Sequence, residues 1–111
     1  MTWKMDYYSD ALQQEIMKLP VGMQARYIHL TERMITYGAN LGMPHTRAMS
    51  NGLFELRIKS KEGIGRVLYC TLVGRRIVML HAFVKKSQKT PNNDMKIAIS
   101  RMKEVKQNAN T

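Results

Sequence analysis

Hydrophobic residues recur every three or four positions in the first third of the chain, which predicts two helices. Ala11 to Leu19 is expected to form a short helix, capped by Ser9 or Asp10 and stopped by Pro20. A second helix begins near Val21, carries a continuous apolar stripe and ends at Gly38. The stripe is made of Met23, Tyr27, Leu30, Met34 and Tyr37.

The pattern then changes to the alternation typical of strands. In Leu53–Lys59, Phe54, Leu56 and Ile58 share one face, and Glu55, Arg57 and Lys59 share the other. Turn residues at Lys61–Gly63 and Gly74-Arg75 separate this strand from two more, Ile64–Val73 and Arg76–Phe83. Three strands joined by short turns predict an antiparallel meander, with Arg76–Phe83 as its central strand.

The remaining segments complete the predicted order. Trp3–Tyr7 alternates weakly, as an N-terminal edge strand would, and Asn40–Asn51 resembles a surface connection. A last helix is expected over Pro91–Gln107, and it turns Lys96, Arg101 and Lys103 outward. Its inward stripe is Met95, Ile99, Met102 and Val105. We therefore predict an α+β fold in which the helices cover one face of a small sheet. It forms a single domain over residues 1–107, and residues 108–111 are a polar tail.

The positive charge is concentrated in one half of the chain. Of the net +10, residues 1–51 contribute +1 and residues 52–103 contribute +9. Such a basic half predicts a polyanionic partner, either a nucleic acid or an acidic protein. The start of the chain has no apolar segment typical of a signal peptide, and no window is apolar enough to span a membrane. From these two observations we expect a cytoplasmic location. The single cysteine, Cys70, lies in an apolar run as an inert buried thiol would and fits a reducing compartment.

The candidate chemistry is cationic. His29, His45 and His81 lie on separate elements without paired ligands, so neither a metal site nor a cofactor is expected. Arg57 and Lys59 share a strand face, Arg66 lies on the next strand, and a lysine-rich segment over residues 85–89 follows the third. The alternative is an ordinary solvated face. If the cations converge instead, they could bind the oxygens of a phosphodiester. They could then promote attack of a 2′-hydroxyl on phosphorus without a metal ion.

Three runs carry a resemblance to a known family: GLFELRIK from Gly52, GRVLYC from Gly65, and GRRIVMLHAFVKKSQKTP from Gly74. They resemble the RelE/ParE toxin superfamily, and most closely its HigB-like, phage-derived branch. The resemblance implies a RelE-like fold and a toxin of a type II toxin–antitoxin pair. It further implies cleavage of translated mRNA on the ribosome and a small helix-turn-helix, DNA-binding antitoxin as partner.

The resemblance also suggests site residues. Arg57, Arg66 and Lys85 or Lys86 correspond to the catalytic cations of the superfamily. The chain lacks the tyrosine that stacks a base in some members and has lysine where they have arginine, so His81 or Lys89 could act instead. Further nucleic-acid contacts are expected from Lys59, Lys61, Lys89, Lys96 and Lys103. Two alternatives stay open: a ParE-like inhibitor of DNA gyrase, and a non-catalytic phage accessory or nucleic-acid-binding protein.

Overall fold

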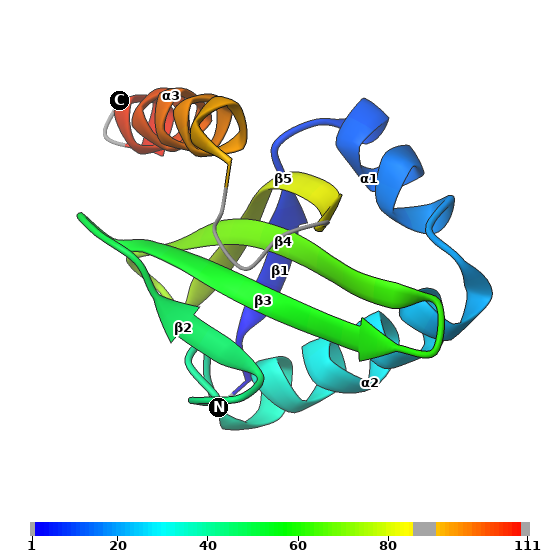
Figure 1. The fold of residues 1–111 in the computed structure, drawn as a ribbon. Helices are drawn as coiled ribbons and strands as arrows, with labels where there is room; N and C mark the ends of the chain where they lie inside the picture. Colours follow the sequence, from blue (N-terminus) through cyan, green and yellow to red (C-terminus); the bar gives the residue numbers. More distant parts are fainter. Residues whose placement is uncertain (1, 86–90, 110–111) are drawn as a thin grey trace.

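A five-stranded sheet with helices on both faces forms the body of the protein (Figure 1). The computed structural model describes residues 2–85 and 91–109. The sheet order is β1-β5-β4-β3-β2. The strands are β1 (Lys4–Tyr7), β2 (Thr46–Ala48), β3 (Leu53–Ser60), β4 (Gly63–Leu72) and β5 (Arg76–Lys85); the helices are α1 (Asp10–Met17), α2 (Val21–Tyr37) and α3 (Asn92–Ala109). The α+β class and the predicted element types are confirmed.

The predicted meander is confirmed as β3, β4 and β5, which pair antiparallel. In the first turn Ser60 pairs with Gly63, whose φ of 131° favours glycine. In the second turn, Gly74 and Arg75 have φ of 92° and 58°. The central strand of the sheet is β4, however, and not β5, because β1 adds a strand beyond β5 and β2 adds one beyond β3.

The two outer strands differ from the prediction. β1 is an edge strand, as expected, but it pairs parallel with β5, so the sheet is mixed. β2 lies in the segment that we interpreted as a surface connection, and it pairs antiparallel with β3. Its three residues are too few to show an alternating pattern among the surrounding turn formers.

The first face of the sheet is covered by α1 and α2. Ser9 caps α1 by accepting a hydrogen bond from the Leu12 N–H. The core beneath the two helices includes the predicted α2 residues Met23, Tyr27, Leu30 and Met34, packed with Leu12, Ile16, Leu56, Ile58, Val67, Tyr69, Ile77 and Met79. Tyr37 was wrongly placed in the stripe, since it is 78% exposed. Thr31 is buried instead, because its hydroxyl donates to the Tyr27 carbonyl and so needs no water.

The start of α2 receives an acceptor from a distant turn. Pro20 precedes the helix and offers no side-chain hydrogen bond. Glu62, in the turn between β3 and β4, accepts a hydrogen bond from the Gly22 N–H at 3.1 Å. A carboxylate at this end of a helix also interacts favourably with the helix dipole. The β3–β4 turn is therefore tied to α2.

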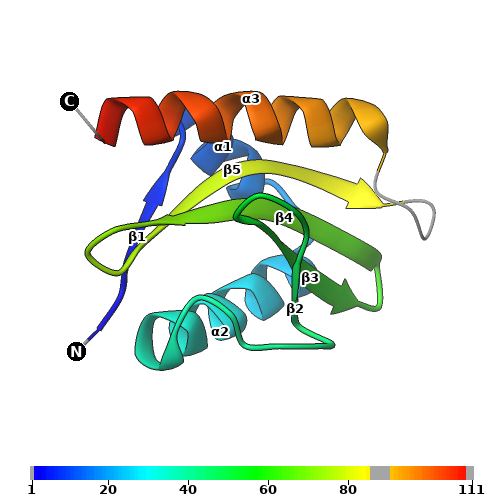
Figure 2. The same ribbon diagram turned by 90° about the vertical axis from the view of Figure 1, so that its left-hand side faces the viewer.

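The helix α3 covers the opposite face, so the prediction that the helices share one face is wrong. Figure 2 shows the sheet between α3 on one side and α2 on the other. The reason is that β4 is apolar at successive positions and presents Leu68 and Cys70 to a second core. That core consists of Leu53, Leu68, Cys70, Val78, Leu80, Ala98 and Met102. Burial raises the pKa of the Cys70 thiol, as expected for an inert cysteine.

The inward face of α3 agrees with the prediction in part. Met102 is buried, and Met95, Ile99 and Val105 pack against the second core. Arg101, expected outside, is half-buried: it lies over the Tyr8 ring and donates to the Leu80 carbonyl at 2.8 Å. The helix also continues to Ala109, two residues beyond the predicted end. No helix in the described part of the chain is long and apolar enough to cross a membrane.

Candidate functional site

Two of the predicted catalytic residues lie directly opposite each other on neighbouring strands. Arg57 on β3 pairs in register with Arg66 on β4, and Arg66 pairs with Phe83 on β5. All three are on the sheet face that α3 covers, since they follow the alternation of Leu53, Leu68 and Cys70. Side chains opposite each other in an antiparallel pair are close neighbours, and like charges there repel. This arrangement therefore needs a compensating negative charge.

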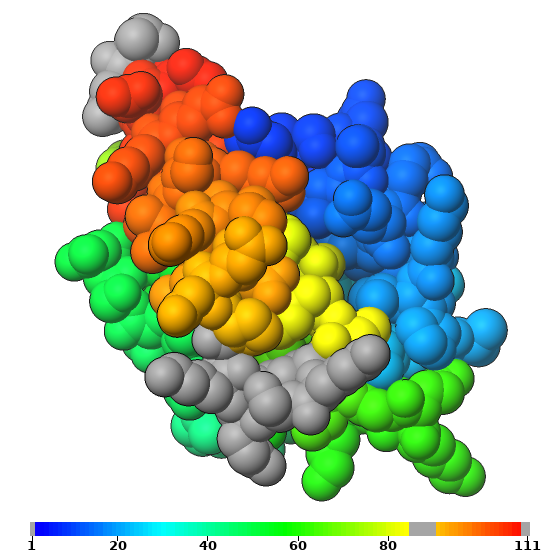
Figure 3. All heavy atoms as spheres, turned by 45° about the horizontal axis from the view of Figure 1, so that its top comes forward, coloured from blue at the N-terminus to red at the C-terminus, as the bar shows by residue number. Residues whose placement is uncertain are grey.

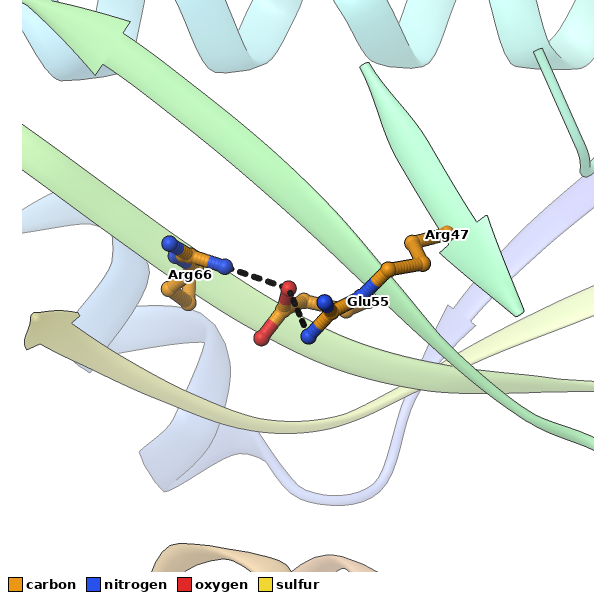
Figure 4. Close-up of polar contacts among 3 residues, drawn as sticks. All are labelled: Arg47, Glu55 and Arg66. Atoms are coloured by element: carbon orange, nitrogen blue, oxygen red, sulfur yellow. Dashed lines mark hydrogen bonds and ion pairs between the residues drawn. The ribbon is translucent and has the colours of Figure 1, made fainter. Parts of the chain in front are cut away.

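Glu55 supplies that negative charge from inside the protein. It lies between Arg66 of β4 and Arg47 of β2 and forms an ion pair with each (Figure 4). Glu55 and Arg66 are buried, with exposed side-chain fractions of 0% and 3%, whereas Arg47 is at the surface and 3.3 Å from the carboxylate. Buried charges must be paired and hydrogen-bonded. Glu55 was thus correctly placed among the cations, but it is a buried partner of Arg66 and not part of an open polar face.

A β-bulge places His81 on the same face. Leu68 pairs with His81, but the next residue, Tyr69, pairs with Met79, so Leu80 is an extra residue in β5. Because of this insertion, the side chains of Leu80 and His81 both lie on the α3 side, where Leu80 enters the second core. The His81 ring stacks on Phe83 with 5.8 Å between ring centroids, and its Nε2 is 2.6 Å from Oδ1 of Asp94 in α3.

Three nitrogen atoms of this cluster have no hydrogen-bond partner among the described residues. They are Nε of Arg57, Nε of Arg66 and Nδ1 of His81, and all three are buried. Buried polar atoms in proteins are nearly always hydrogen-bonded, so three exceptions on three adjacent strands require an explanation. Guanidinium N–H groups are well suited to the oxygens of a phosphate. The cluster concentrates positive charge that would stabilise an anion, but an anion would reach these enclosed nitrogens only after the cluster opened.

The other predicted residues are divided between this site and distant surfaces. Lys59 lies two residues beyond Arg57 on the same face, and Lys61 is exposed in the β3–β4 turn. Lys85 ends β5, where it pairs with Ile64, two residues beyond the pair of Arg66 and Phe83. Lys86 and Lys89 lie outside the described residues. The exposed Lys96 and Lys103 line a shallow pocket on α3 with Ile99, Ser100, Glu104 and Gln107. None of these residues belongs to the cluster of Arg57, Arg66 and His81. Figure 3 shows α3 lying along the surface beside the end of β5.

The remaining histidines are not part of this site. Burial, together with the charges of Arg26, Arg33 and His29, lowers the pKa of His45. These four residues form a second basic group on α2 and the segment before β2, which the sequence analysis did not anticipate. Within residues 2–85 and 91–109, no three side chains of His, Cys, Asp or Glu are arranged to hold one metal ion.

Asp94 and Arg47 were not predicted as members of the site. An acidic residue in the first turn of a helix is common because it interacts with the helix dipole, so Asp94 gave no sign of a partner on β5. Arg47 lies on the short strand that the sequence pattern did not reveal. The Glu55–Arg66 pair carries the clearest signal, since Glu55 lies on the polar face of a strand whose alternation the structure confirms and Arg66 lies on the neighbouring strand.

Removal of the Glu55 carboxylate is expected to destabilise the whole protein. Glu55→Ala leaves Arg66 buried without its partner and opposite Arg57, which should cost about 3–5 kcal/mol. Asp6→Ala is the matched control, since it removes a carboxylate that pairs with an arginine, Arg76, on the surface at 3.1 Å. That loss should cost at most about 1 kcal/mol. Urea unfolding of the two variants measures the difference, and equal small losses would contradict the role of Glu55.

Comparison with known proteins assigns the chain to a family. The family model described as phage-derived protein Gp49-like (DUF891) matches residues 14–103, which run from α1 into α3 and include the whole cluster around Arg66. No curated protein matches the chain significantly. The match agrees with the phage-derived origin that the sequence resemblance implied, and it is compatible with a toxin. This protein belongs to the Gp49-like family of phage-derived proteins.

Proposed function

We propose that this protein is the toxin of a type II toxin–antitoxin pair and that it cleaves translated mRNA on the ribosome. The observation that carries the proposal is the cluster of Arg57, Arg66 and His81, whose three buried nitrogens lack partners among the described residues. A phosphodiester that opens this buried cluster would supply oxygen acceptors to Nε of Arg57 and Arg66, and the adjacent 2′-hydroxyl would supply a donor to Nδ1 of His81. The resemblance to RelE-like and HigB-like toxins and the Gp49-like family match support the same conclusion.

The proposed reaction involves RNA, this chain and water. A 2′-hydroxyl attacks the adjacent phosphorus, the O2′–P bond forms and the P–O5′ bond breaks. The products are a 2′,3′-cyclic phosphate and a 5′-hydroxyl. Arg57 and Arg66 would bind the non-bridging oxygens and stabilise the charge that grows on them. Arg66 is held by Glu55 before RNA arrives, so little reorganisation accompanies the reaction.

The surrounding cations would bind the ribosome. Lys59 and Lys61 lie on the strand and turn that lead away from Arg57, and Lys96 and Lys103 are exposed on α3. Contacts of this kind to phosphates add affinity without sequence information. By the sequence resemblance alone, we assign a catalytic role to Lys85 or Lys86 and place Lys89 with these anchoring cations.

The first prediction separates ribonuclease activity from the two other functions. After induction, primer extension on a translated message should reveal new 5′ ends, and DNA supercoiling by purified gyrase should be unaffected. The gyrase alternative has one observation in its favour: Met17, Val21 and Ile28 are exposed apolar residues on the α1–α2 side and could contact a protein. Intact mRNA together with loss of supercoiling would replace our proposal with that alternative. Harmless expression without antitoxin would favour an accessory protein.

The second prediction distinguishes catalytic cations from anchoring ones. Arg57→Ala should lower the single-turnover cleavage rate by about 10²–10³-fold while ribosome binding changes little, because a preorganised charge acts mainly on the transition state. Arg66→Ala and Lys86→Ala should behave in the same way. Lys96→Ala and Lys103→Ala are the matched controls, which should weaken binding and lower its salt slope by about one unit each.

Thermal melts of each variant must first establish that it is folded, above all for Arg66→Ala, which removes the buried cation paired with Glu55. The catalytic assignment is wrong if all these variants lose affinity alike and cleave at the normal rate once bound.

The third prediction concerns the antitoxin, which we propose to be a small helix-turn-helix DNA-binding protein with an acidic segment. Such a segment could fold over the cationic face and cover it reversibly. The affinity of the purified pair should then fall as salt rises, because exposed charge pairs are screened. Titration calorimetry at low and high ionic strength tests this. A constant affinity would mean that the antitoxin docks elsewhere.

A further inference from the structure

We infer that Asp94 is a positioning residue that fixes the His81 ring so that its Nδ1 atom can take the proton of the attacking 2′-hydroxyl. The inference rests on the proposed ribonuclease function and adds to it the identity of the base. Three observations carry it: the 2.6 Å contact between His81 Nε2 and Asp94 Oδ1, the bulge at Leu80, and the absence of a partner for Nδ1 among the described residues.

The contact with Asp94 determines which ring nitrogen carries the proton. An ionised carboxylate only accepts hydrogen bonds, so the Nε2 atom must be the donor. A neutral His81 then has its lone pair on Nδ1, the atom without a described partner. This atom is buried in the free protein, so the inference requires that RNA binding expose it. The second nitrogen of a histidine is commonly set in this way by the hydrogen bond of the first. Asp94 would also stabilise the positive ring that forms when Nδ1 takes a proton.

The helix α3 holds the bulge as well as the ring. The Leu80 carbonyl accepts a hydrogen bond from Arg101 at 2.8 Å, and Asp94 lies seven residues earlier on the same helix. The two contacts are therefore about two helical turns apart and act on consecutive residues of β5. Stacking on Phe83 restrains the His81 ring further. A bulge next to a reactive group commonly serves to redirect a side chain.

The proton balance of the step is simple. The O2′–H bond breaks as its proton moves to His81 Nδ1, and the electron pair left on O2′ forms the bond to phosphorus. The P–O5′ pair leaves with O5′, which takes a proton from water. His81 becomes a cation next to the Asp94 carboxylate and returns its proton to solvent after the product leaves.

The tautomer can be measured without any RNA. Long-range proton–nitrogen NMR of the imidazole rings distinguishes Nδ1–H from Nε2–H, and His81→Gln identifies the signal among the three histidines. We expect the neutral ring to populate the Nε2–H form alone in the wild type and to shift towards a mixture in Asp94→Ala. A wild-type ring protonated on Nδ1 when neutral would overturn the inference.

Cleavage kinetics test the consequence. Asp94→Ala should lower the single-turnover rate by about 10²-fold, within the range that a positioned base contributes. Because Asp94 acts through His81, it should have no further effect in a His81→Ala background. The matched control is Glu104→Ala, which removes another α3 carboxylate with a 2.6 Å contact to the body of the protein, at the Tyr8 hydroxyl. Its rate should equal that of the wild type.

The outcomes separate this inference from the proposed function. If the wild type cleaves and Asp94→Ala does so equally fast, or if the losses from Asp94→Ala and His81→Ala multiply in the double variant, Asp94 is not the positioning residue. If the cleavage rate of Glu104→Ala falls as far as that of Asp94→Ala, the loss of rate comes from weaker docking of α3 and not from the orientation of His81. If the wild type cleaves no RNA, the proposed function fails and the assignment of a base fails with it, whereas the NMR result still decides whether Asp94 sets the tautomer.

Discussion

β4 is buried on both faces, and its burial determines what the neighbouring strands and helices must provide. From Gly65 to Cys70 every residue of this strand is buried, because α2 lies below it and α3 above it. A strand in this position normally contains only apolar residues. Arg66 is the exception, and a charge at such a position requires an internal partner. Glu55 meets this requirement, and the ion pair fixes the guanidinium at the centre of the sheet.

A single side of the sheet thus combines structural and chemical roles. One end carries the second core, in which Leu53, Cys70 and Met102 seat α3. The other end carries Arg57, Arg66 and His81, close to the first turn of the same helix. Docking of α3 and the geometry of the cluster are therefore coupled, since the helix that closes the core also holds the histidine.

The sequence predicts the meander well because its physical signals are local. Alternation in Leu53–Lys59 and the glycines at positions 63 and 74 depend only on neighbouring residues, and the structure agrees with them. Arg57 could be assigned to the polar face for the same reason, whereas β4 is buried at successive positions and its pattern gives no face for Arg66. Three other features depend on contacts between distant segments: the parallel pairing of β1, the position of α3 and the partnership of Asp94 with His81. Periodicity contains no information about such contacts. Arg101 illustrates this. Its position on the helix predicted exposure to solvent, whereas its side chain contacts the Leu80 carbonyl of β5 and the Tyr8 ring before α1.

The extra residue at Leu80 has a consequence for comparisons between relatives. Side chains of a strand normally alternate, so two consecutive residues share a face only where a bulge absorbs an extra residue. Without the bulge the same residues would alternate regularly, and His81 would turn towards α1 and α2. An alignment that ignores the bulge would match His81 and Phe83 with residues on the wrong side of the sheet. Within this fold, the number of residues between the Gly74-Arg75 turn and the end of β5 is as informative as their identity.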